Sequence, residues 1–215
     1  MSEFNTSRIA RALRRLKNAK LDVFGSEGHG LRLNPTLSEG DVVAFERKHG
    51  VVLPQDYRQF LTEVGNGGDG PFNEVFALGQ MDDNFGYKFW QEGDGFVGDL
   101  SEPFPFEEEW NDLPAMPDSD LAESNEAEYD RQMEAFERVY WNGAVINGAI
   151  PICHQGCALR VLLVVTGSQA GFLWDDRRSE YCGLRPLRLA DGSAATFGSW
   201  YGEWLDGCLA ALPKN

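Results

Sequence analysis

The residues that could perform chemistry are few, and their spacing does not favour catalysis. The chain has three histidines and four cysteines, of which Cys153, His154 and Cys157 form the most metal-like group. Structural zinc sites usually need a second pair of ligands at comparable spacing, and Cys182 stands alone. A cysteine nucleophile with His154 as its base is also disfavoured, because neighbouring strand residues point to opposite faces. We therefore expect no metal, no cofactor and no catalytic residue.

Other catalytic patterns are missing as well. The sequence contains no nucleophile elbow, P-loop or dinucleotide fingerprint, and the glycines of 65–70 lack the following helix and lysine of a phosphate loop. Neighbouring carboxylates, such as Asp82 with Asp83, are typical of solvated surface in a protein this acidic. One of three hypotheses is an enzyme that uses the acidic middle of the chain, but the sequence places no nucleophile next to a base there.

The charge distribution indicates a protein partner. The 215 residues include 19 Lys and Arg and 34 Asp and Glu, for a net charge of −15. Such a charge repels phosphates and anionic headgroups, so we expect no nucleic-acid and no membrane partner. Residues 99–140 contain fourteen acidic and two basic residues, whereas residues 1–20 contain six basic residues and one acidic residue.

Length and composition predict one domain over residues 1–215, with a core that needs no metal or disulfide. No stretch approaches the roughly 18 apolar residues that span a bilayer, and the start of the chain lacks the apolar part of a secretory signal. Four cysteines are too few for a disulfide scaffold. We expect a cytoplasmic protein whose thiols are free and buried.

The elements that must position these residues begin with helices. An apolar stripe predicts an amphipathic helix within residues 1–20, on a basic arm that we assign to 1–36. This helix either packs on its own acidic domain or binds a partner. Ser38 and Asp41 fit the N-terminus of a second helix that ends at Gly50. A third helix begins at Pro54 and ends at Gly65, where a glycine-rich turn follows.

Strands and a last helix complete the pattern. Strands are predicted over 72–79, 144–153, 159–166 and 172–174, with weaker candidates over 85–90 and 95–100. Residues 99–140 are predicted as an acidic loop followed by a helix, inserted into the domain. Apolar residues at helical spacing predict a closing aromatic helix over 197–209. The fold class is therefore α+β: a mainly antiparallel sheet packed by N-terminal helices and the C-terminal aromatic helix.

The run over 37–68, LSEGDVVAFERKHGVVLPQDYRQFLTEVGNGG, resembles the N-terminal signature of the SUKH superfamily. The family pattern is a helix, a short gap, L-P-x-x-Y-x-x-F-L and then N-G-G. The residues that match are Phe45, Glu46, Leu53, Pro54, Tyr57, Phe60, Leu61, Asn66, Gly67 and Gly68. Downstream, Gly171 to Trp174 look like part of the family's paired central strands, and the helix with Trp204 looks like its closing helix. The resemblance covers about 37–79 and 143–209.

The resemblance implies an interaction module without catalysis. Family members include bacterial immunity proteins and a fungal cell-wall synthesis regulator, so two functions are open. The first is an immunity protein that binds and neutralises a cognate toxin, often a nuclease, whose basic groove an acidic segment could fill. The second is a regulatory or scaffolding adaptor without a toxin. The predicted partner-binding residues are Glu107, Glu108, Glu109, Trp110, Asp112, Asp82 and Asp83; the alternative for this segment is a solubilising loop.

Glu46 is the exception among the family residues, because the others are scaffold. It is the one carboxylate among the matching residues, most of which are apolar. We expect Glu46 to accept hydrogen bonds from backbone donors near the turn from Gly65 to Gly68, which is a structural role.

Overall fold

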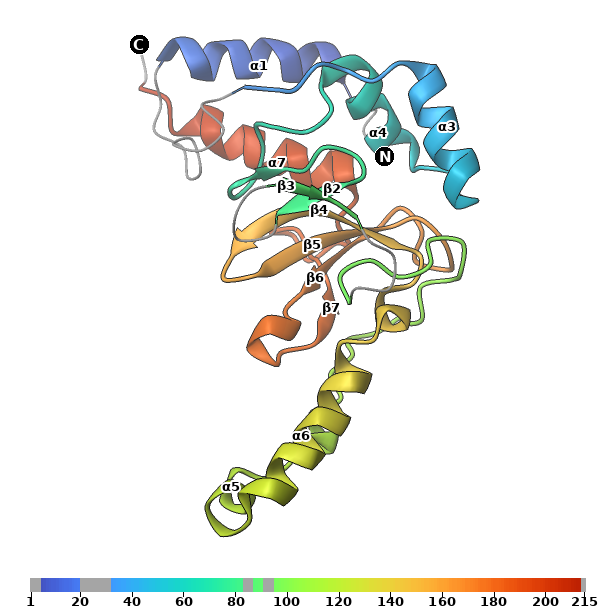
Figure 1. Cartoon of the computed structure of the whole chain (residues 1–215). Helices are drawn as coiled ribbons and strands as arrows, with labels where there is room; N and C mark the ends of the chain where they lie inside the picture. The colour runs from blue at the N-terminus through green and yellow to red at the C-terminus, as the bar shows by residue number, and fades with distance from the viewer. Residues whose placement is uncertain (1–4, 20–31, 83–86, 91–94, 214–215) are drawn as a thin grey trace.

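The computed structural model describes residues 5–19, 32–82, 87–90 and 95–213 (Figure 1). A five-stranded antiparallel sheet has the strand order β1-β4-β5-β6-β7, and β2 and β3 form a separate antiparallel pair. Figure 1 shows α1, α3, α4 and α7 gathered on one side of the sheet, and α5 with α6 projecting from the opposite side. The predicted α+β class is confirmed.

The elements have the following bounds. The helices are α1 (Thr6–Ala19), α3 (Glu39–His49), α4 (Gln55–Gln59), α5 (Ser119–Ser124), α6 (Glu126–Tyr140) and α7 (Phe197–Ala210). Short helical turns are η1 (Phe60–Val64), η2 (Leu113–Ala115), η3 (Gly143–Ile146) and η4 (Arg178–Glu180). The strands are β1 (Glu74–Val75), β2 (Gln80–Asp82), β3 (Tyr87–Phe89), β4 (Ala149–Gly156), β5 (Leu159–Val164), β6 (Leu173–Asp176) and β7 (Leu184–Pro186).

Local signals place the N-terminal helices where the sequence predicts them. The Asp41 backbone N–H donates to Ser38 Oγ at 3.1 Å, and the Ser38 N–H donates to the Asp41 carboxylate at 3.0 Å. This reciprocal capping box starts α3. Gly50 ends α3 in the left-handed conformation, at φ 66°. Pro54 precedes α4, whose last turn widens into the π-helical turn η1 before Gly65.

Helix α1 packs on the body through its apolar stripe. Ile9, Ala12, Leu13 and Leu16 are buried, and α1 contacts α7 and η1. Arg8 forms an ion pair with Asp206 of α7. The cations that follow Arg8 along the helix are exposed. The predicted amphipathic helix is therefore present, with its apolar side used for packing.

The glycine-rich turn needs glycine at two successive positions. Gly67 and Gly68 have φ of 80° and 100°, which side chains with a Cβ rarely adopt. A Cβ on Gly68 would lie 2.4 Å from the carbonyl oxygen of Arg32. Beside them, the Asn66 side chain accepts a hydrogen bond from the Leu78 N–H at 2.8 Å. The turn thus brings the chain closely past the segment before α3.

Strand β5 is buried on both faces of the sheet. Val161 and Leu163 belong to the main core, which includes the apolar residues of α1, α4 and α7. Leu162 and Val164 belong to a second cluster with Trp174 and Leu184. Aromatic side chains from the acidic segment cover this second cluster: Phe104, Phe106 and Trp110. The first part of the acidic segment is therefore a cover of the sheet as well as a carrier of charge.

The structure contradicts the sequence predictions for residues 95–100 and for two of the cysteines. Residues 95–100 form no strand, and a Cβ on Gly98 would lie 2.3 Å from the carbonyl oxygen of Gly143, so the chain passes too close for side chains. All four cysteines are free, as expected, but only Cys153 and Cys208 are buried. Cys157 is exposed in the turn between β4 and β5, and Cys182 is exposed in the loop between η4 and β7. Among the described residues, no helix is both long and apolar enough to cross a lipid bilayer.

Candidate protein-binding surface

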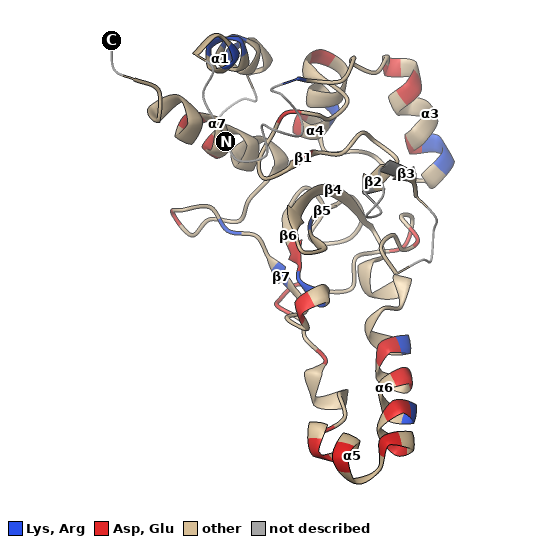
Figure 2. Ribbon diagram, turned by 60° about the vertical axis from the view of Figure 1, so that its left-hand side comes forward, with Lys and Arg blue, Asp and Glu red and all other residues tan. Residues whose placement is uncertain are grey.

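Helices α5 and α6 form a projecting arm, which we call the acidic arm and define as residues 118–140. Figure 1 shows α6 extending away from the sheet, with α5 beside its outer end, and Figure 2 shows acidic residues along both helices. Polar residues cap both helices: the Asp120 N–H donates to Asp118 at 3.0 Å, and the Glu128 N–H donates to Asn125 at 3.3 Å. The arm is thus two short capped helices that pack mainly on each other.

Both arginines of the acidic arm are paired within their own helix. Arg131 donates to Glu128, with 2.9 Å from Nε to Oε2, and Arg138 donates to Glu134 at 3.2 Å. The hydrogen bond from Arg131, supported by one from Gln132, lowers the pKa of Glu128 to about 2. Neither arginine of the arm is therefore left to form an ion pair with the arm's other carboxylates.

The other carboxylates of the arm face solvent. They are exposed, and none forms an ion pair with a residue that the structure describes: Asp118, Asp120, Glu123, Glu126, Asp130 and Glu137. Glu126 and Asp130 are four residues apart on α6, which is about 6 Å along the helix axis. The apolar residues Leu121, Tyr129 and Met133 are half-buried. The arm therefore exposes a row of negative charges.

The loop glutamates that the sequence singles out are also exposed. Glu107, Glu108 and Glu109 all reach solvent, and Glu107 accepts a hydrogen bond from Ser168 Oγ at 2.7 Å. Asp112 is half-buried and directly precedes η2. We call Glu107 to Glu109 together with the unpaired carboxylates of the arm the acidic surface.

Trp110, another of the predicted partner-binding residues, is half-buried and packs within the protein. Its ring stacks on Phe106 and on Tyr140, with centroid distances of 5.1 Å and 5.3 Å. Its backbone exchanges two hydrogen bonds of 2.8 Å with Leu184 of β7. Trp110 thus attaches the acidic loop to the sheet. Its position after three glutamates gave no sign of the apolar face beneath it.

The other two predicted aspartates are not brought to this surface by any described contact. Asp82 is the last residue of strand β2. Asp83 lies outside the described residues. Their role in partner binding stays a prediction.

A buried polar network at the base of the arm was missed by sequence reasoning. Tyr140 Oη donates to Asn111 at 3.1 Å and accepts from the Gly183 N–H at 2.9 Å. The buried Arg178 donates to the carbonyl oxygen of Tyr140 at 3.4 Å and lies over the Trp141 ring at 4.9 Å. The sequence feature that could have indicated this network is the run Asp-Asp-Arg-Arg over 175–178, which directly follows an apolar strand. This network fixes where the arm leaves the body.

Glu46 accepts a backbone hydrogen bond, as expected, but not from the expected donors. Its Oε1 accepts a hydrogen bond from the Leu53 N–H at 3.0 Å, and its Oε2 lies 2.7 Å from the guanidinium of Arg58. The prediction of donors near the turn from Gly65 to Gly68 is therefore wrong. Glu46 is in the last turns of α3, so the chain that reverses into α4 is its nearest source of donors.

The chemistry-bearing residues form no metal centre in the described part of the chain. No group of three or more His, Cys, Asp or Glu side chains there could hold a metal ion. The Cys153 thiol is buried and donates to the Pro71 carbonyl oxygen at 3.3 Å, whereas Cys157 is exposed in the turn between β4 and β5. These two thiols therefore have different environments.

The comparisons with known proteins give one family. A model of the SMI1 / KNR4 family (SUKH-1) matches residues 36–181, about two thirds of the chain. The matched range begins in the segment before α3 and ends one residue after η4. It therefore includes the 80–142 stretch that the resemblance in the sequence left out, and it leaves out α1 and α7. No curated protein and no solved structure matches the chain.

Proposed function

The chain belongs to the SMI1 / KNR4 family (SUKH-1), and from this premise we propose that it is a non-catalytic immunity protein that binds and neutralises a cognate toxin. Membership supports a protein-binding module of the immunity or regulatory kind in general. The toxin and its nuclease character belong to the proposal. We also propose that residues 1–215 form one domain, with a basic arm over 1–36 and an acidic insertion over 99–140.

The acidic surface is the observation that carries the proposal. It joins the exposed Glu107 to Glu109 with an arm whose own arginines are already paired. An arm that projects from the body can enter a concave surface on a partner, which a flat acidic face cannot do. The buried network around Arg178 supports this role, because it holds the base of the arm in one position.

A basic partner follows from this charge. A protein that acts on nucleic acid needs cations to contact phosphates, and its groove is therefore positive. Complementary charge accelerates association of two proteins by orders of magnitude at low ionic strength. Fast association suits a protein that must block a toxin before the toxin reaches its target.

Co-expression tests the proposal directly. The product of the neighbouring reading frame is produced in a bacterial host with and without this protein, and growth and co-purification are measured. We expect growth arrest by the neighbour alone, and rescue with recovery of a complex when both are present. Continued arrest in the presence of both proteins would overturn the proposal. A harmless neighbour that still co-purifies would favour the adaptor hypothesis instead.

A second experiment tests the surface. Three carboxylates of the arm are neutralised together: Glu126→Gln, Asp130→Asn and Glu137→Gln. We expect the association rate constant with the purified toxin to fall about tenfold at low ionic strength, and the difference to shrink in high salt because the Debye length falls to about 3 Å at 1 M. Stopped-flow fluorescence measures both effects.

The matched control changes the same number of charges at the other end of the molecule. It neutralises three exposed carboxylates near α1 and α7: Glu63→Gln, Glu203→Gln and Asp206→Asn. We expect association within about twofold of the unmodified protein, since these charges lie far from the acidic arm and the Coulomb interaction weakens with distance. Equal loss in both variants would show that only net charge matters and would contradict the assignment of the arm.

A further inference from the structure

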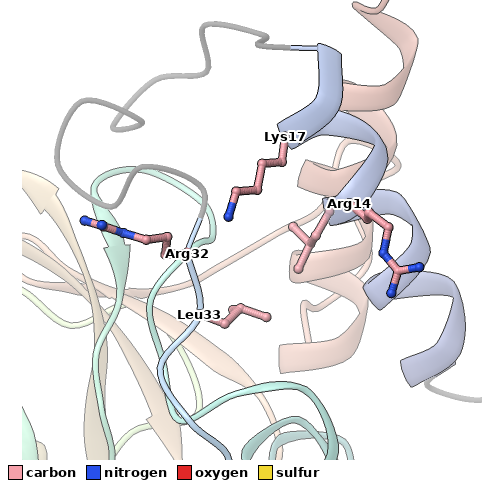
Figure 3. Close-up of a pocket in the computed structure, with 5 residues that line it drawn as sticks. Arg14, Lys17, Arg32 and Leu33 are labelled. Atoms are coloured by element: carbon pink, nitrogen blue, oxygen red, sulfur yellow. The ribbon is translucent and has the colours of Figure 1, made fainter.

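A basic pocket lies on the side of the molecule opposite the acidic arm. Its volume is about 400 Å³, and we call it the basic pocket. It is lined by Leu13, Arg14, Lys17, Arg32 and Leu33. The first three residues come from α1 and the last two from the segment before α3 (Figure 3). Such a site is unexpected on a protein with a net charge of −15.

The cations of this pocket are available for a ligand. Arg14, Lys17 and Arg32 are exposed, and their side chains form no ion pair within the part of the chain that the structure describes. Arg8, on the same helix, differs from these three cations because it forms an ion pair with Asp206. Three exposed cations beside one pocket create a positive potential that attracts an anionic ligand. The basic pocket therefore favours a ligand with several negative charges.

The arrangement of the side chains favours an extended ligand. Figure 3 shows Lys17 extending from α1 towards the segment of Arg32 and Leu33, while Arg14 and Arg32 extend to opposite sides. The three cations therefore do not converge on one point, as they would around a single small anion. Between them, Leu13 is buried and Leu33 is half-buried, which gives the pocket an apolar part.

We infer that the basic pocket binds a short acidic segment of a protein partner. One apolar side chain of that segment contacts Leu13 and Leu33, and the carboxylates on either side of it pair with Arg14, Lys17 and Arg32. A peptide supplies both parts, because its backbone places charged residues next to an apolar one. This site is separate from the acidic surface and does not depend on the proposed function.

Two other polyanions fit the pocket less well. Single-stranded nucleic acid binds through aromatic side chains that stack on its bases, and no aromatic residue among those that the structure describes lines the pocket. An amphipathic helix binds an anionic membrane through a free apolar face. The apolar stripe of α1 is already buried, from Ile9 to Leu16.

Peptide binding tests this inference. The probe is a fluorescein-labelled peptide, Glu-Asp-Phe-Glu-Asp, titrated against the full chain by fluorescence anisotropy. Spectra of leucine methyl groups report the site, since binding in the pocket shifts the methyl signals of Leu13 and Leu33. We expect saturable binding that weakens with salt, and weaker binding when serine replaces the phenylalanine of the peptide.

Two triple variants with the same change in charge locate the site. The pocket variant is Arg14→Gln, Lys17→Gln and Arg32→Gln, and we expect about tenfold weaker peptide binding from the loss of three exposed ion pairs. The control variant is Arg11→Gln, Arg15→Gln and Arg188→Gln, all exposed and outside the pocket. It should bind within about twofold of the unmodified protein. Circular dichroism melting checks that both variants are folded.

Several outcomes overturn the inference. No peptide binding, or equal loss in the two variants, removes the pocket as a peptide site. Methyl shifts that spare Leu13 and Leu33 place the peptide elsewhere. A twelve-nucleotide single-stranded DNA is tested in place of the peptide, and so are phosphatidylserine vesicles. If either probe binds more tightly than the peptide, and only the pocket variant loses that binding, the pocket is assigned to nucleic acid or to a membrane.

Discussion

The carboxylate of Asp176 and the guanidinium of Arg178 form a bidentate ion pair inside the protein. The distances are 2.9 Å from Nε to Oδ1 and 2.7 Å from Nη2 to Oδ2, and the two side chains are 5% and 0% exposed. Arg178 also donates to the carbonyl oxygen of Gly95 at 2.8 Å. Burying two charges costs free energy that only good geometry and such extra hydrogen bonds offset. The end of the sheet and the base of the acidic arm therefore depend on an intact pair.

Removal of one partner tests this dependence. The substitution Arg178→Met leaves the Asp176 carboxylate buried without its cation, and we expect the free energy of unfolding to fall by about 3–5 kcal/mol. Adding Asp176→Leu removes the stranded charge and should recover part of the loss. Urea denaturation measures both variants. The control is Arg177→Met, whose partly exposed pair with Glu180 should contribute less than about 1 kcal/mol. Equal losses at the two arginines would contradict the role of burial.

Glu46 gives a second test, because Arg58 contacts two glutamates with different exposure. The Glu46 side chain is 14% exposed, and the Glu39 side chain is 68% exposed. We expect Glu46→Ala to lower the free energy of unfolding by about 2 kcal/mol, since the Leu53 N–H loses its acceptor. Glu46→Gln should cost less because its amide oxygen still accepts. Thermal and urea unfolding measure the change, with Glu39→Gln as the control. An unchanged melting temperature in both Glu46 variants would contradict the structural role.

The sequence predicted the structural features that depend on residues close to one another in the chain. Ser38, Asp41 and Gly50 bound α3 through contacts within a few residues, and the apolar spacing of α7 reflects one face of one helix. The strands β5 and β6 follow from a β-branched run, a short turn and a second apolar run. Local chemistry determines each of these features, so a single sequence is enough to predict them.

The sequence could not predict what depends on distant segments. Glu46 could have bonded donors on either side of it, and only the path from α3 into α4 selects Leu53. Trp110 was predicted to bind a partner together with the three glutamates before it, and only the fold shows that it covers the second apolar face of β5. The burial of Arg178 likewise depends on the base of α6, where it donates to the carbonyl oxygen of Tyr140, 38 residues earlier in the chain.

A substitution of Trp110 therefore distinguishes a structural role of this residue from a role in partner binding. We expect Trp110→Ala to lower the free energy of unfolding by about 2–3 kcal/mol, because its half-buried ring stacks on Phe106 and Tyr140. Urea denaturation measures this loss, and near-ultraviolet circular dichroism should show the changed aromatic packing. The control is Phe89→Ala, whose ring is 75% exposed and should contribute within about 0.5 kcal/mol. Full stability combined with lost partner binding would instead make Trp110 an interface anchor.

Asp69 makes stability depend on pH in the direction opposite to most carboxylates. Burial raises its pKa from 3.8 to about 7, although the Gly70 N–H opposes the shift, and Tyr201 and Cys208 of α7 face it. A raised pKa means that the folded state holds the proton more tightly than the unfolded state. Its contribution to stability is therefore complete below about pH 4 and is lost as the pH rises to about 7.

The substitution Asp69→Asn removes this titration. Between pH 4 and pH 8, the free energy of unfolding of the variant should rise relative to the unmodified protein by about 4 kcal/mol, from 1.36 kcal/mol per pKa unit. Urea denaturation at pH 4, 6 and 8 gives the difference at each pH. Asp99→Asn is the control, because hydrogen bonds from Ser101 lower the pKa of Asp99 and its contribution is lost as the pH falls. A difference between Asp69→Asn and the unmodified protein that stays constant with pH would show that Asp69 does not titrate in this range, and that burial is not what determines its protonation.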